Sequence, residues 1–112
     1  MKKLLLIESS DIGALYSAEA TRALGYEPVF LCELKDYQGD TLEQLLRYRH
    51  LDTPTHSAET LLAFLQNHPN WGQENLKELA GVMSFADSRL MVAHEVAHAL
   101  GVPGLDPAVG IL

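Results

Sequence analysis

Apolar side chains recur along this chain with two periods, one typical of buried strands and the other of amphipathic helices. Residues 3–8 form a nearly continuous apolar run closed by polar residues, as in a strand covered on both faces. Residues 13–24 change to helical spacing, and Gly25 stands where a helix can end in a left-handed conformation. Residues 27–33 then predict a second buried strand.

The remaining chain continues the alternation of the two patterns. They predict a short helix at 41–46, a weak extended segment at 48–51, a helix at 58–67, a strand at 80–85 and a helix at 86–100. Ser57 is typical of a helix N-cap, and Ser84 with Asp87 resembles a capping box. We expect Gly101 to end the last of these helices, and a further helix to begin at residues 106–107.

Strands separated by helices of this length favour right-handed β-α-β units and a mostly parallel sheet. The predicted fold class is therefore α/β: one domain over residues 1–112, with an open Rossmann-like sheet covered by helices on both faces. Such sheets bind ligands beyond the carboxyl ends of their strands, near a change in strand order. This rule directs attention to residues 8–13 and 84–87.

Charge and composition exclude several classes of function. The net charge of −7 and the scattered Lys and Arg residues argue against a nucleic-acid partner. No apolar stretch is long enough for a membrane span, and the run at residues 4–7 is too short for a signal peptide. The single cysteine, Cys32, falls in a predicted strand, which favours a core residue and a reducing cytoplasm over a disulfide framework or a nucleophile.

One short motif suggests a metal. His94, Glu95 and His98 spell H-E-x-x-H, in which two histidines one helical turn apart bind zinc and the glutamate polarises a bound water. A catalytic zinc needs a third protein ligand, but the longer form of the motif places it at Gly104, which has no side chain. Asp106 is the only acidic residue after His98 and is out of phase.

The helical spacing offers a simpler interpretation of the same motif. At 100° per residue, the three motif residues share the polar face of an amphipathic helix, opposite its apolar face. Dinucleotide, Walker-type and G-x-S-x-G motifs do not occur in the sequence. A solvated helix face is therefore the main expectation, and a small zinc metallohydrolase using His94 and His98 remains the alternative.

The order of the segments resembles the N-terminal, pre-ATP-grasp domain of ATP-grasp carboxylate–amine ligases. The resemblance covers essentially the whole chain and is carried by KKLLLIESS (2–10), LGYEPVFL (24–31), the DT turn (52–53) and LAGVMSFADSRLMVAHEVAHALGVPGLDP (79–107). The last stretch is similar to the family pattern of a G-V-x-S-x-x-D strand end, an Ala-rich helix and L-G-x-P-G-x-x-P. In that frame the HEVAH residues lie on the ordinary Ala-rich helix.

The resemblance implies a parent enzyme in which ATP phosphorylates a carboxylate and an amine attacks the acylphosphate. It implies substrate contacts from Ser9, Ser10, Ser84 and Asp87, although the last two are equally expected to cap their helix. ATP and Mg²⁺ would bind mainly to the remaining ATP-grasp domains of the same chain. We therefore expect no catalytic residue, no cofactor and no activity in residues 1–112 alone.

A third interpretation stays open beside the ligase domain and the zinc hydrolase. The chain could be a stand-alone α/β binding or dimerisation domain, including a homodimer, because a lone lobe exposes the surface that would meet its partners. The expected partners of the ligase domain are small-molecule carboxylate and amine substrates, with neither nucleic acid nor membrane.

Overall fold

The computed structural model describes residues 2–8, 14–68, 71 and 77–104. Its elements, in chain order, are β1 (Lys3–Ile7), α1 (Ala14–Ala23), β2 (Glu27–Cys32), the 3₁₀ turn η1 (Leu34–Asp36), α2 (Gly39–Arg47), β3 (Arg49–Asp52), α3 (Ala58–Asn67), β4 (Leu79–Met83), the 3₁₀ turn η2 (Asp87–Arg89) and α5 (Leu90–Leu100). Within these residues no helix has the length and apolarity needed to cross a membrane.

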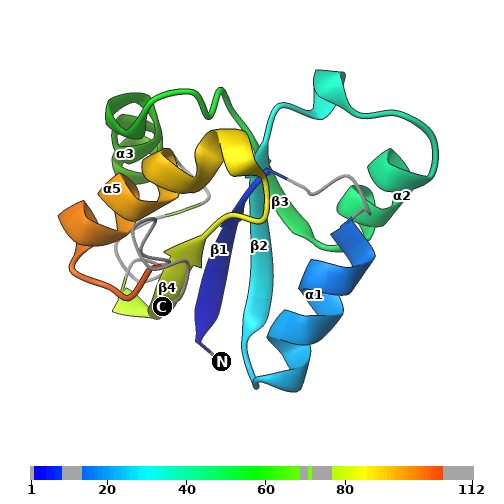
Figure 1. Cartoon of the computed structure of the whole chain (residues 1–112), viewed down its shortest axis with the longest axis horizontal. Helices are drawn as coiled ribbons and strands as arrows, with labels where there is room; N and C mark the ends of the chain where they lie inside the picture. Colours follow the sequence, from blue (N-terminus) through cyan, green and yellow to red (C-terminus); the bar gives the residue numbers. More distant parts are fainter. Residues whose placement is uncertain (1, 9–13, 69–70, 72–76, 105–112) are drawn as a thin grey trace.

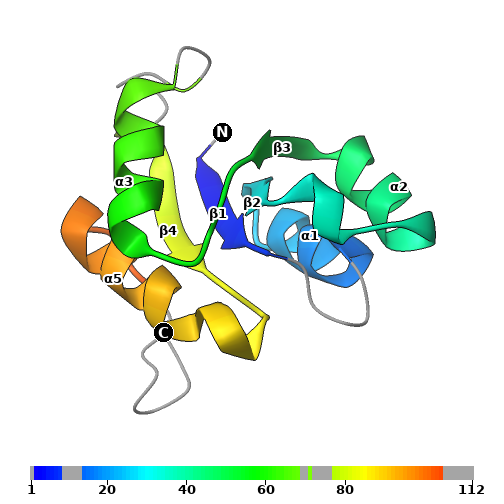
Figure 2. The same ribbon diagram turned by 90° about the horizontal axis from the view of Figure 1, so that it is seen from above.

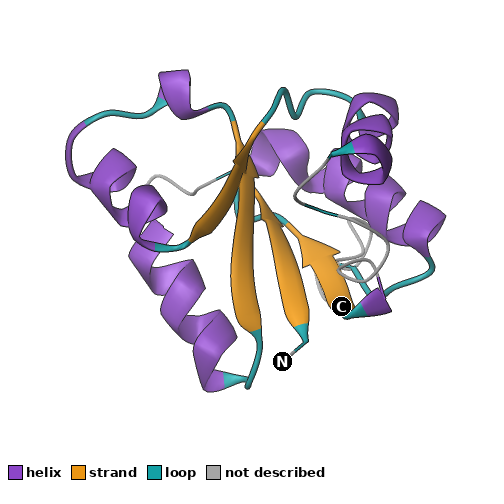
Figure 3. Ribbon diagram, turned by 180° about the vertical axis from the view of Figure 1, so that it is seen from behind, coloured by secondary structure: helices purple, strands orange, loops and turns teal. Residues whose placement is uncertain are grey.

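The four strands form one parallel sheet in the order β3-β2-β1-β4, which confirms the predicted α/β class (Figure 1). Leu5 of β1 pairs with Val29 of β2 on one side and with Val82 of β4 on the other. The weak extended segment is a true strand, because Leu51 of β3 pairs with Leu31 of β2. Seen from behind, the strands fan out between two groups of helices (Figure 3).

Helices cover both faces of the sheet, α1 and α2 on one and α3 and α5 on the other (Figure 2). The core on the α3 and α5 side is built from Leu5, Ile7, Val29, Leu31, Leu51, Leu61, Leu65, Trp71, Leu79, Val82, Ala93, Val96 and Ala97. The core on the other side is built from Leu4, Leu6, Ala14, Ala18, Phe30, Cys32 and Leu45. Residues of β1 alternate between the two cores, as the two-residue period of a strand requires.

The predicted helix ends agree with the structure in three cases and differ in one. Gly25 takes the left-handed conformation after α1, with φ of 89°. Ser57 accepts a hydrogen bond from the Thr60 backbone N–H at 3.3 Å, and Gly101 ends α5 with φ of 69°. The capping box is wrong: Ser84 Oγ accepts from the backbone N–H of Ala86, at 3.1 Å, and α5 begins only at Leu90. The chain between them forms η2, so the helix predicted at 86–100 is shorter than expected.

After α5 the chain returns to the free edge of β4, where a single-residue bridge extends the four-stranded sheet. Gly104 forms a parallel bridge with Val82, whose backbone N–H donates to the Pro103 carbonyl at 3.0 Å. This approach depends on Gly81, where a Cβ atom would lie 2.8 Å from the Pro103 oxygen and 3.2 Å from Leu4 Cδ1. The predicted helix start at residues 106–107 lies outside the described residues.

An apolar groove of about 320 Å³ lies between α1 and β4. Leu4, Gly81 and Met83 line it from the sheet, while Leu24 and Phe85 line its sides. The last two side chains are 70% and 48% exposed. The α1 side of β4 is thus covered less completely by the described residues than the α5 side.

Gly81→Ala tests the close approach of residues 102–104 to β4. We expect the added methyl group to lower the free energy of unfolding by about 1–3 kcal/mol, because neither the Pro103 carbonyl nor Leu4 can withdraw without disturbing the sheet. Urea unfolding followed by circular dichroism measures the change. Gly101→Asn is the matched control, since Asn tolerates positive φ and its Cβ would meet nothing within 4 Å. Equal stability of the two variants would contradict the steric argument.

Candidate functional site

The direction of the sheet order changes at β1, which pairs with β2 on one side and with β4 on the other. The chain leaves β1 for α1 on one face and reaches β4 from α3 on the opposite face. In open α/β sheets this switch point, at the carboxyl ends of the strands, is where ligands bind. The residues that follow β1 and β4 are therefore the first place to look for a site.

Glu8, which follows β1 directly, has a backbone conformation that side chains rarely adopt. Its φ of 63° lies in the left-handed region, the only such value at a non-glycine residue in the described part of the chain. Such a conformation costs about 1–2 kcal/mol. The Glu8 backbone N–H donates to the Leu31 carbonyl at 2.8 Å, which fixes the residue against β2. Strain of this kind persists where the surrounding structure enforces it, often at functional sites.

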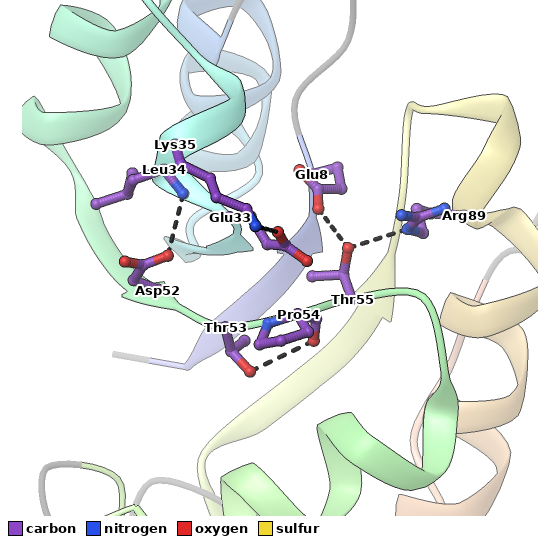
Figure 4. Close-up of polar contacts among 9 residues, drawn as sticks. All are labelled: Glu8, Glu33, Leu34, Lys35, Asp52, Thr53, Pro54, Thr55 and Arg89. Atoms are coloured by element: carbon purple, nitrogen blue, oxygen red, sulfur yellow. Dashed lines mark hydrogen bonds and ion pairs between the residues drawn. The ribbon is translucent and has the colours of Figure 1, made fainter.

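The Glu8 carboxylate is held by two hydroxyl groups from different parts of the chain, and Figure 4 shows one of them, that of Thr55. Tyr37, after η1, donates to Oε1 at 2.5 Å, and Thr55, after β3, donates to Oε2. Thr55 is fully buried, and its oxygen accepts from Nε of Arg89 at 2.9 Å. A directed chain of hydrogen bonds thus runs from the Arg89 guanidinium through Thr55 to Glu8, joining the ends of three strands.

Ser84 links the carboxyl ends of β1 and β4, the two strands that meet at the switch point. The residue is only 1% exposed, and its hydroxyl donates to the Ile7 carbonyl at 2.5 Å. The same oxygen accepts from the Ala86 backbone N–H, so the hydroxyl serves as donor and acceptor at once. These bonds tie the end of β4 to the end of β1. They give Ser84 a structural role, and a substrate contact through it stays a prediction.

The other predicted substrate residues are less informative. Asp87 is exposed in the first turn of η2, close in sequence to Arg89. The N-cap positions of η2 and α5 are Ala86 and Arg89, so Asp87 is not the N-cap of either element. Ser9 and Ser10 lie outside the described residues. Their contacts with substrate, like that of Asp87, remain predictions.

The HEVAH segment lies in α5 with the predicted orientation. Glu95 and His98 are exposed and His94 is half-buried, whereas Val96 and Ala97 are buried. Within the described ranges, no three His, Cys, Asp or Glu side chains come together as a metal site would require. No described carboxylate, thiol or imidazole therefore completes a zinc site at His94 and His98.

Cys32, the last residue of β2, is fully buried in the core beneath α1 and α2. Burial raises the pKa of its thiol to about 12, and the negative charges of Glu8, Asp52 and Asp36 act in the same direction. A thiol that keeps its proton is a poor nucleophile. The structure thus agrees with the interpretation of Cys32 as a core residue.

Three residues of this network were not predicted from the sequence. Glu8 lay inside the region singled out after the first strand, but Tyr37, Thr55 and Arg89 did not stand out. The available signal was the position of Thr55 shortly after a strand, in a segment that looked only weakly extended. Arg89 could have been noticed as a cation just before a helix that starts at the carboxyl edge.

No family model matches the chain, and no curated protein or solved structure matches it significantly.

Ser84→Ala tests the structural role of the buried hydroxyl. The variant leaves the Ile7 carbonyl and the Ala86 N–H without their partner, so we expect the free energy of unfolding to fall by about 1–3 kcal/mol. Ser88→Ala is the control, because Ser88 is exposed nearby and its replacement should change stability by no more than about 0.5 kcal/mol. Urea unfolding of both variants decides whether the link between β4 and β1 stabilises the fold.

Cys32 provides a test that depends on pH. Because its pKa is higher in the folded chain than the value of about 8.5 in an unfolded one, the unfolded chain loses the thiol proton first. Stability should therefore be unaffected by this group below about pH 8 and decline as pH rises toward 12.

At pH 8 a thiol reagent should label Cys32 only as the chain unfolds, with the chain in guanidinium chloride as the reactive control. Rapid labelling of the folded chain would show that the thiol is accessible.

Proposed function

We propose that this chain is the substrate-side, N-terminal domain of an ATP-grasp carboxylate–amine ligase that works in the cytoplasm. In the proposed reaction a substrate carboxylate attacks the γ-phosphorus of ATP and ADP leaves. An amine then attacks the acylphosphate carbonyl, and phosphate departs as the amide forms. The proposal rests on the sequence resemblance, and one structural observation supports it most directly.

That observation is the polar network at the switch point. Glu8, Thr55 and Arg89 come from segments far apart in the sequence, and their side chains form one hydrogen-bonded chain at the carboxyl edge. A structural core has no need for a strained backbone at Glu8 or for a half-buried guanidinium. A domain that presents a small polar substrate to another domain needs oriented polar groups at this edge.

The described residues account for binding and orientation, and leave the phosphoryl transfer to the rest of the enzyme. Hydrogen bonds that fix the direction of a polar side chain favour a productive substrate geometry. The family resemblance assigns ATP and its Mg²⁺ to the further domains of the proposed enzyme. The amine and carboxylate substrates are small molecules in this proposal.

The protein encoded by the complete reading frame tests the function. We expect it to release ADP in the presence of Mg²⁺-ATP only when a suitable carboxylate is supplied, and hydroxylamine to trap the acylphosphate as a hydroxamate. Residues 1–112 alone should release no ADP under the same conditions, since the resemblance places ATP and Mg²⁺ on the further domains. ADP release by residues 1–112, or a reading frame without an ATP-grasp core, would contradict the proposal.

Two further measurements separate the alternative functions. A zinc hydrolase predicts one equivalent of zinc per chain, lost in His98→Ala, whereas the ligase domain predicts none bound there. A dimerisation domain predicts a stable dimer of residues 1–112 by sedimentation, with no ligase activity from the complete protein. Either result would replace the ligase proposal.

A further inference from the structure

Building on the proposed function, we propose that Arg89 binds an oxyanion, the carboxylate of the substrate, and that Thr55 and Glu8 are positioning residues for its guanidinium.

Arg89 is held firmly while much of its hydrogen-bonding capacity remains unused. A guanidinium has five N–H donors in a planar fork. Nε donates to Thr55 at 2.9 Å, and Nη1 donates to the Ser88 carbonyl at 3.3 Å. Among the described residues no acceptor is found for Nη2. The two bonds fix the plane of the fork and leave donors for a bidentate contact, which suits carboxylate or phosphate geometry.

The positive charge of Arg89 is also not neutralised by a direct ion pair within the described part of the chain. The nearest connected carboxylate, Glu8, is separated from it by the Thr55 hydroxyl. At the opposite edge of the sheet, Lys3 does contact Glu78 at 3.1 Å and Glu27 at 3.8 Å. The fold therefore forms direct ion pairs with the buried Lys3 and places a hydroxyl beside the half-buried Arg89.

The Thr55 hydroxyl lets Glu8 orient Arg89 without a direct bond between the carboxylate and the guanidinium. A hydroxyl has one proton, and Thr55 donates it to Glu8, so the lone pairs of its oxygen face Arg89 Nε. Tyr37 satisfies the other oxygen of the carboxylate. Because both Glu8 oxygens already accept hydroxyl protons, the carboxylate is hydrogen-bonded without a direct contact to the guanidinium. Glu8 makes these two hydrogen bonds from a left-handed backbone conformation.

The charge of Glu8 favours a carboxylate over a phosphate as the ligand. A substrate carboxylate has one negative charge, whereas inorganic phosphate has between one and two near neutral pH. Repulsion from Glu8, one hydroxyl away from the guanidinium, therefore weakens a phosphate more than a carboxylate. The chain as a whole, with a net charge of −7, acts in the same direction.

Titration of residues 1–112 with sodium acetate and, separately, with sodium phosphate tests the site by NMR at constant ionic strength. We expect the Arg89 Nε–Hε signal to shift saturably with acetate, and with a higher dissociation constant for phosphate. In Arg89→Ala and Arg89→Gln, followed on the Ser88 backbone amide, acetate affinity should fall about tenfold or more. Lys35→Ala is the matched control, because Lys35 is an exposed cation that pairs with Glu33; its acetate affinity should equal that of the parent chain.

Variants of Thr55 separate positioning from a purely structural role. Thr55→Val removes the hydroxyl at nearly constant shape, and we expect acetate affinity to fall severalfold. Thr55→Ser restores the hydroxyl and should restore affinity, even if the loss of its methyl group lowers the melting temperature. If affinity followed stability across the two variants, and not the presence of the hydroxyl, the positioning role would be wrong.

The outcomes distinguish this site from the proposed enzyme function. The absence of a saturable acetate shift, or equal acetate affinity in the parent chain and both Arg89 variants, would overturn the oxyanion site whatever the complete protein catalyses. Tighter binding of phosphate than of acetate would overturn the carboxylate assignment. ADP release is measured separately on the complete protein, so a failure there leaves the binding result intact.

Discussion

The position of β1 between two parallel neighbours is the constraint on which the rest of the structure depends. β2 and β4 lie on opposite sides of β1, and helices cover both of its faces. A strand buried in this way must be largely apolar, and residues 4–7 are, while Lys3 at its start is paired with Glu78 and Glu27. The same position brings the end of β1 beside the end of β4. Ser84 bonds to Ile7 across that junction, and Glu8 follows directly.

Much of this fold could be predicted because local patterns decide it. The predicted helix at 58–67 matches α3, and the N-cap at Ser57 is present. The start of α5 was harder to predict: Ser84 lies where a capping residue would, but its hydroxyl bonds to Ile7, which is distant in sequence. The extended segment predicted at 48–51 is confirmed as β3, and its pairing with β2 makes it a strand. The error at the start of α5 arises because a tertiary contact overrides local preference.

The candidate site was predicted in its location and only partly in its residues. The rule for open α/β sheets led to residues 8–13 and 84–87, and Glu8 does take part in the network. Thr55 and Arg89 meet only because β3 and β4 end at the same edge of the sheet. No spacing in the sequence encodes that meeting. The positive φ of Glu8 is equally invisible, since the usual glycine is missing from that position.

The geometry of α5 explains why its start and not its H-E-x-x-H motif belongs to the candidate site. The helix begins at Leu90, just after Arg89, and runs away from the carboxyl edge on one face of the sheet (Figure 1). With a rise of about 1.5 Å per residue, His94 and His98 lie roughly 6 and 12 Å along the helix from its first residue. Their side chains are half-buried and exposed on the flank of the sheet, whereas Arg89 remains at its edge. A ligand at the switch point therefore meets the turn before the helix, and the motif that is most conspicuous in the sequence lies away from it.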